Sequence, residues 1–273
     1  MSGPIFSPDS QFWRVNRELA VGLAGPRAVL MQIAHPLIAA GVSEHSRFRR
    51  HRLARLYRTS AAAAAITFGS RDLATRAVRA IDRRHETIHG TLKTATGAFP
   101  AGTPYDANDP ELKLWVLSTI TDSALTVFDW FVSPLSRSER EEYYRDSLVV
   151  ATMFGIPDEI VPPTYAGFEG YMSRMLDGDA VAVGAEAREI ADALFSLSVM
   201  GVALRAGSAA GIGLLPGRVR REFGFSWGPR EDGWLRRAGD VSRRVRRHVP
   251  GILCASPAAT LSEWMTPRRS AVC

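Results

Sequence analysis

Apolar residues recur at intervals of three and four along most of the chain, which is the period of an amphipathic helix. No run alternates between apolar and polar residues in the way that a strand does between hairpin turns. The pattern predicts helices from Asp9 or Ser10 to Leu23, from Pro26 through Leu37, over 53–68 and 71–88, from Asn108 onward, and over 136–154, 163–177, 184–200 and 230–248. We therefore expect an all-α protein with one globular helical domain over 13–249, packed in the style of a globin. An extension over 1–12 precedes this domain, and a poorly ordered tail over 250–273 follows it.

Proline, glycine and capping residues mark where these helices change direction or begin. Pro36 should kink the second helix, because proline cannot donate the hydrogen bond that the helix needs there. Residues 94–107 have the composition of a loop, and Asn108 can cap the long helix that follows. Ser136 and Glu139 have the spacing of a capping box, which predicts another helix start.

The composition is that of a folded globular protein, with 46% hydrophobic and 23% charged residues. The start of the chain lacks the charged and apolar regions of a signal peptide. The cysteines are Cys254 and Cys273, and no CxxC pair is present. This pattern argues against a cysteine-based zinc site, an iron–sulfur cluster or a disulfide framework, so we expect a cytoplasmic protein.

The longest apolar stretch runs from Leu112 to Val132 and contains Lys113, Asp122 and Asp129. Three charges suit a buried core helix better than a membrane span, and we expect no transmembrane segment. Asp122 lies in the most apolar part, and a carboxylate buried there needs an arginine or another donor as its partner. We expect a structural ion pair at this position.

The net charge is +6, and the excess is local. Arginines gather in two clusters, one of Arg47, Arg49, Arg50 and Arg52 and the other of Arg236, Arg237, Arg243, Arg244, Arg246 and Arg247. Such clusters can meet nucleic acid or anionic lipid. Few aromatic residues interleave with them, so we interpret both as solvated helix faces and expect no nucleic-acid partner.

The predicted helix over 71–88 carries the most informative histidine. A single apolar stripe follows the spacing 4, 3, 4, 3, 4 through Ala74, Val78, Ile81, His85, Ile88 and Leu92. An imidazole that points into a core needs a hydrogen-bond partner or a metal. The spacing by itself leaves both a satisfied core histidine and a ligand open.

The same segment contains His85, Glu86 and His89 in the order H-E-x-x-H, which is the zinc-protease signature when both histidines share one helix face. Glu111 is a possible third ligand. The chain shows no strand pattern for the substrate-binding sheet of such an enzyme, and His89 lies beside the apolar stripe. A zinc hydrolase is therefore an alternative rather than the main interpretation.

Polar residues that could take part in binding or catalysis also precede this helix. Arg55, Arg58 and Thr59 share one face of the helix over 53–68, and the small side chains of Ala61–Ala65 follow them. A flat surface of this kind suits a neighbouring helix or a planar ligand. His35 lies beside the expected kink, where it can be a cap, a core residue or a pocket residue.

Several segments together resemble the family of MpaB and latex-clearing-protein oxygenases. The resemblance extends from about Trp13 to Trp227. Its motifs are Trp13-Arg14-Val15 with Glu18, Gly25-x-Arg27-Ala28-x-Leu30-x-Gln32-x-Ala34-His35-Pro36, Ala39-Ala40-Gly41-Val42-x-Glu44-His45-Ser46-x-Phe48, Arg55-Leu56-x-Arg58-Thr59, His85 with His89 and Gly90, and Tyr105-x-Ala107-Asn108-Asp109-Pro110-Glu111-Leu112 with Trp115. Each motif is short, and their order and spacing carry the resemblance.

The resemblance implies an all-helical domain that encloses a b-type haem, with His85 as the iron ligand and His35 and Arg55 near the cofactor. It also implies oxidative cleavage of a carbon–carbon double bond by O2 in an isoprenoid or other lipophilic substrate. In the rubber-cleaving branch, the helix that matches Arg55, Arg58 and Thr59 lies on the distal side of the haem. A glutamate acts there as a base, and Glu44 is the candidate in this chain.

Arg58 departs from the family's pattern, because the rubber-cleaving branch carries lysine at this position. A neutral lysine amine can coordinate iron, whereas an arginine guanidinium stays protonated and cannot. The resemblance therefore implies an open or water-occupied sixth position here, and the substitution puts rubber itself in doubt as the substrate. Besides the zinc hydrolase, a non-catalytic helical protein that binds haem or a lipid remains an alternative.

Overall fold

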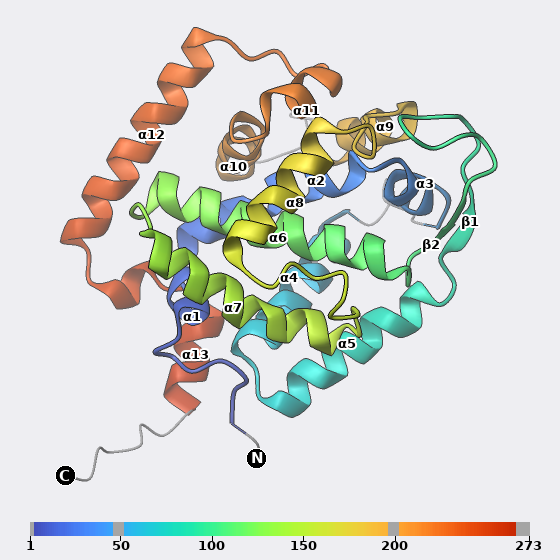
Figure 1. Cartoon of the computed structure of the whole chain (residues 1–273). Helices are drawn as coiled ribbons and strands as arrows, with labels where there is room; N and C mark the ends of the chain where they lie inside the picture. The colour runs from blue at the N-terminus through green and yellow to red at the C-terminus, as the bar shows by residue number, and fades with distance from the viewer. Residues whose placement is uncertain (1–2, 46–51, 196–201, 266–273) are drawn as a thin grey trace.

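The structure is a computed structural model that describes residues 3–45, 52–195 and 202–265, without the side chains of 52–57 and 202–204. Helices account for nearly all of its regular structure (Figure 1). In chain order the elements are α1 Gln11–Asn16, η1 Leu19–Leu23, α2 Ala24–Ile33, α3 Pro36–His45, α4 Arg52–Phe68, α5 Arg71–His85, β1 His89–Thr91, β2 Pro104–Asp106, α6 Pro110–Phe131, α7 Arg137–Met153, α8 Tyr165–Asp177, α9 Ala185–Phe195, α10 Val202–Gly213, α11 Gly217–Glu222, α12 Pro229–His248, η3 Gly251–Cys254 and α13 Pro257–Met265. The prediction of an all-α fold is confirmed.

The core is built around α6, which crosses the middle of the molecule (Figure 1). Asp109, rather than the predicted Asn108, caps this helix. It accepts hydrogen bonds from the backbone N–H groups of Glu111 (2.8 Å) and Leu112 (3.4 Å), and Pro110 fills the first position. Helices α2, α7 and α12 all pack against α6. The predicted core helix is thus confirmed, and no helix in the parts of the chain that the structure describes is long and apolar enough to cross a membrane.

The expected ion pair of Asp122 is formed with Arg27, whose guanidinium is 2.7 Å from the carboxylate. Arg27 is buried, and its other nitrogens donate to the Leu214 carbonyl (2.8 Å) and to Ser123 Oγ (2.7 Å). The guanidinium therefore joins α2, α6 and the segment that follows α10. The capping box of Ser136 and Glu139 at the start of α7 is also confirmed.

The segment around Pro36 differs from the prediction of one kinked helix. Helix α2 ends at Ile33, and α3 begins at Pro36. Proline disfavours the helical conformation of the residue before it and suits the first position of a new helix. Two helices therefore replace one, and His35 lies between them.

The helix predicted over 71–88 is shorter than expected. Helix α5 ends at His85, and the chain enters an antiparallel ribbon in which β1 pairs with β2, with His89 opposite Asp106. Each strand has three residues, too few to produce an alternating pattern in the sequence. The prediction that the helix continues to residue 88 was wrong, and residues 94–107 include a strand at their end.

The region after Pro250 is not the irregular tail that the sequence suggested. It forms η3 and α13; α13 packs against α4, and its Ala259 is fully buried. The indole of Trp13 donates to Glu263 (3.0 Å), and Ser262 donates to the Phe68 carbonyl. Residues 266–273 lie outside the described part of the chain.

Candidate functional site

Two histidines, of which His35 is buried and His85 is half-buried, lie at the junction between α2, α3, α5 and the start of α6. His35 stands between α2 and α3, and His85 is the last residue of α5. Charged groups of one short segment act on both, with Asp109 acting on His35 and Asp106 and Lys113 on His85; Asp82 and Arg84 of α5 also act on His85. The fold therefore brings two histidines that are 50 positions apart to the same end of the central helix.

Both imidazoles are held in the neutral form. Burial lowers the pKa of His35 to about 4, although the Asp109 carboxylate opposes the shift. Burial and the ammonium of Lys113 lower the pKa of His85, against the opposite influence of Asp82 and Asp106. A neutral imidazole is the form that binds a metal.

The junction also contains buried polar atoms without a hydrogen-bond partner. Of the four such side-chain atoms in the described residues, three lie here, namely Nδ1 of His35, Nδ1 of His85 and Oδ1 of Asn108; the fourth is Nε2 of Gln11. Leaving a buried donor or acceptor unpaired costs about 1–3 kcal/mol. A group bound at this junction could pair with these atoms and so remove that cost.

A small apolar cluster lines this junction beside the main core. It consists of Leu37, Ala40, Leu92, Tyr105 and Leu112, with Ile38, Ile88 and Phe99 packed against it. The rings of His35 and Phe99 have centroids 5.1 Å apart. The surroundings of His35 are thus largely hydrocarbon, which explains why burial lowers its pKa.

Glu44 lies at the end of α3, where the β1–β2 ribbon passes over it. Its carboxylate accepts a short hydrogen bond from the Tyr105 hydroxyl and an ion pair from Lys93 (2.7 Å). These two contacts lower the pKa of Glu44, so the carboxylate is ionised at neutral pH. Gly90 is required beside them, because a Cβ there would come within 2.7 Å of the Tyr105 oxygen.

The residues expected on the distal side lie on α4, which packs against α5. Arg58 and Thr59 are exposed. Arg55 belongs to the backbone of α4, but its side chain lies outside the described residues. The structure describes no contact between Arg58 or Thr59 and either histidine, so their assignment to the site stays a prediction.

The H-E-x-x-H segment does not have the geometry of a zinc signature. His85 ends α5, Glu86 is the cap that follows it, and His89 is an exposed residue of β1. The two histidines therefore do not share a helix face, as the signature requires. In the described ranges of the chain, no group of three or more histidine, cysteine, aspartate or glutamate side chains is placed to hold a metal ion.

Some residues of this junction were not predicted as site residues. Tyr105 and Asn108 belonged to the motif that carried the family resemblance, and that motif was the available signal. Lys93 lies between the predicted helix over 71–88 and the predicted loop over 94–107, and no local pattern connects it to Glu44. Its role depends on the pairing of β1 with β2, which brings the chain back over α3.

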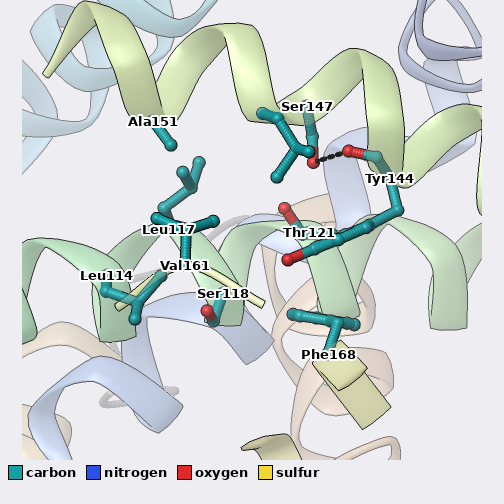
Figure 2. A pocket seen from close by; sticks show the side chains of 10 residues that line it. Leu114, Leu117, Ser118, Thr121, Tyr144, Ser147, Ala151, Val161 and Phe168 are labelled. Atoms are coloured by element: carbon teal, nitrogen blue, oxygen red, sulfur yellow. Dashed lines mark hydrogen bonds between the residues drawn. The ribbon is translucent and has the colours of Figure 1, made fainter. Parts of the chain in front are cut away.

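Two cavities lie away from these histidines. One is enclosed by α6, α7, α8 and Val161, where Tyr144, Thr121 and Phe168 converge around it, and its volume of about 10 Å³ is at most that of one water molecule (Figure 2). The other, of about 250 Å³, is lined by Ala191, Asp192, Phe195 and Phe225. Neither includes His35 or His85.

Comparisons with known proteins agree with this architecture. An uncharacterized protein of Mycobacterium tuberculosis, Rv2237, is 26% identical to the chain over 182 residues, which cover 65% of this chain and 68% of the relative. The uncharacterized protein Mb2261 of Mycobacterium bovis matches with the same identity and coverage. No solved structure matches the chain. The family model of the ER-bound oxygenase mpaB/B'/rubber oxygenase catalytic domain matches residues 13–244. The chain therefore belongs to this oxygenase family.

Proposed function

We propose that the protein is a haem b-dependent oxygenase that uses O2 to cleave or oxidise a carbon–carbon double bond of an isoprenoid or other lipophilic substrate. The observation that carries the proposal is the half-buried, neutral imidazole of His85, whose buried Nδ1 has no hydrogen-bond partner, in a chain of an oxygenase family. The substrate class rests on the resemblance of the motifs around His35, Glu44 and Asn108.

The residues of the junction fit a haem group. His85 offers an unpaired nitrogen, and burial keeps its imidazole neutral. His35 offers a second neutral imidazole beside the apolar cluster, which suits contact with a macrocycle. Haem, when bound, supplies an iron centre that activates O2, which no side chain of the protein can do.

The chain's own residues would perform three tasks. His85 would hold the iron, and Lys113 nearby would disfavour the protonation that breaks such a bond. Arg58 cannot be a second ligand, because its guanidinium stays protonated, so it would contribute charge and hydrogen bonds alone, together with Arg55 and Thr59. Glu44 is ionised, as a base must be, and its ion pair with the exposed Lys93 can open at little cost.

An absorption spectrum of the purified full chain, combined with metal analysis, tests this proposal. We expect a Soret band and about one iron per chain, in the protein as isolated or after haem is added. Stoichiometric zinc without iron, or no Soret band after haem is supplied, would contradict the proposal. Haem binding without any O2 consumption across a series of isoprenoid alkenes would instead favour a protein that stores or senses haem.

A further inference from the structure

Exposed apolar side chains are concentrated at the C-terminal end of the fold. Of the twelve large hydrophobic residues that are exposed in the described part of the chain, eight lie between Trp234 and Met265. Five of them belong to α12 and the η3 turn after it, namely Trp234, Val241, Val245, Ile252 and Leu253. The cost of leaving them in water points to an interaction surface.

The orientation of α12 is fixed by contacts on its opposite side. Leu235 is buried, and its carbonyl accepts a hydrogen bond from the indole of Trp130 (3.2 Å). A Cβ at Gly239 would lie 2.9 Å from the same indole. Arg246 forms a bidentate ion pair with Glu18, with both distances 2.8 Å. These contacts hold α12 along one edge of the molecule, with its other face toward solvent (Figure 1).

The solvent face of α12 combines apolar and basic side chains. Trp234, Val241 and Val245 are seven and four positions apart, which places them in one stripe. Arg237 and Arg244 are exposed and lie three or four positions from Val241, so they flank the stripe. The whole helix has seven arginines and three acidic residues, and it therefore carries most of the chain's net charge of +6.

We propose that this α12 surface, formed by Trp234, Arg237, Val241, Arg244 and Val245 with Ile252 and Leu253, binds the headgroup region of a membrane that contains anionic lipid. A helix with aromatic and aliphatic residues on one stripe and arginines beside them lies in the membrane interface, with its apolar side chains among the acyl chains and its arginines at the phosphates. The inference rests on this surface alone and does not depend on haem or on the proposed reaction.

The charge distribution selects this partner over two others. A second copy of the chain would bring the same arginine-rich helix against itself or against a molecule of the same net charge, which is unfavourable. A nucleic acid would pair with the arginines but would leave Val241, Val245, Ile252 and Leu253 without an apolar environment. Anionic lipid satisfies both kinds of side chain.

Flotation of the full chain with vesicles tests the proposal. We expect binding to vesicles of phosphatidylcholine mixed with phosphatidylglycerol, weak binding to phosphatidylcholine alone, and a decrease with added salt. Arg237→Glu with Arg244→Glu should lower the affinity by at least about tenfold. The matched control is Arg76→Glu with Arg79→Glu, two exposed arginines of α5 with the same change in charge, which should retain most of the binding.

A second pair of variants tests the apolar stripe. Val241→Ser with Val245→Ser should weaken binding by about tenfold, because two aliphatic side chains no longer enter the bilayer. The control, Ile120→Ser with Val149→Ser, changes two exposed residues of α6 and α7 and should leave vesicle binding unchanged. Brominated phospholipid should quench tryptophan fluorescence of the bound protein, and Trp234→Phe should remove part of that quenching. Melting temperatures show whether each variant is folded.

Four results would overturn the inference. The first is absence of binding to the anionic vesicles by a folded wild-type protein. The second is an equal loss in the α5 control, which would indicate general attraction rather than this surface. The third is binding to duplex DNA or RNA in preference to vesicles with no effect of the serine variants. The fourth is a dimer in solution that Val241→Ser with Val245→Ser dissociates.

Discussion

His35 and His85 show how burial determines the chemistry that a side chain can perform. Each would be partly protonated near neutral pH in water, and burial lowers the pKa of each, with the Lys113 ammonium adding to the effect at His85. Exposed His89, only four residues after His85, has no such environment. The histidines therefore differ in solvation, and we expect different effects when each is replaced.

Replacing His85 with Ala should abolish haem retention, while His89→Ala should leave most of it. The reason is that the half-buried His85 imidazole has a buried Nδ1 without a hydrogen-bond partner, whereas His89 is exposed on β1. Haem content per chain, measured after gel filtration of both variants, checks this. Equal loss of haem in the two variants would indicate a site that uses both His85 and His89. Loss of haem with His35→Ala alone would indicate that His35 is the iron ligand.

Replacing Arg58 with Lys should create a six-coordinate ferric state at alkaline pH. A lysine amine can lose its proton and bind iron, whereas the guanidinium of Arg58 cannot. Ferric spectra of wild type and variant from neutral to alkaline pH measure the change. Identical spectra throughout would mean that Arg58 does not face the iron, and Ser60→Lys on the same helix provides a control for an added amine.

His35 should make the stability of the haem-free protein dependent on pH. Its pKa is about 4 in the folded state and about 6.5 in the unfolded state, so the unfolded chain binds more protons between these values. The contribution of His35 is complete above pH 6.5, and it should fall by about 3 kcal/mol as the pH decreases to 4.

Urea unfolding at a series of pH values measures this effect. His35→Asn should remove most of the decrease between pH 6.5 and 4, because asparagine does not titrate. His248→Asn, at an exposed position of α12, should behave as the wild type does. A variant at residue 35 that retains the full decrease would show that other groups cause it.

At the scale of elements, the sequence predicts what is local and misses what depends on distant partners. The period of apolar residues identified α4, α6 and α7, and the capping box located the start of α7. The end of α5 at His85 was missed, because it depends on the pairing of β1 with β2, a partner 15 residues further along the chain. Likewise, the junction of His35 and His85 requires the packing of helices that no local pattern records.

The α13 helix was missed for a related reason. It is short, and its large apolar residues Leu261, Trp264 and Met265 are exposed, so its stability comes from packing on α4 and from the contact of Glu263 with Trp13. Ala259→Leu should therefore destabilise the protein by about 1–3 kcal/mol, because there is no space for a larger side chain at a fully buried position.

Chemical denaturation measures that change, and Ala80→Leu is its control. Residue 80 is an exposed position of α5, where leucine should change the free energy of unfolding by less than about 0.5 kcal/mol. If both variants had the same stability, α13 would not be packed on the rest of the fold in solution.

At the scale of the whole molecule, Arg27 links three parts of the chain through Asp122, Ser123 and the Leu214 carbonyl. Asp122→Ala leaves the buried guanidinium without its counter-ion, which should cost about 2 kcal/mol or more, with allowance for the partial exposure of Asp122. Glu169→Ala removes the exposed pair with Arg137 and should cost less than about 1 kcal/mol. Urea titration of both variants checks the difference, and equal losses would contradict the linking role of Arg27.

The position of α13 beside α1 and α4 also has a consequence for synthesis. The first helices leave the ribosome early, yet Trp13 and Phe68 find their partners Glu263 and Ser262 only when nearly the whole chain has been translated. Until then, apolar surface of α4 that α13 covers in the native fold stays open to water. Nascent chains arrested before α13 emerges should therefore bind a chaperone such as trigger factor, and chains arrested after it should be released.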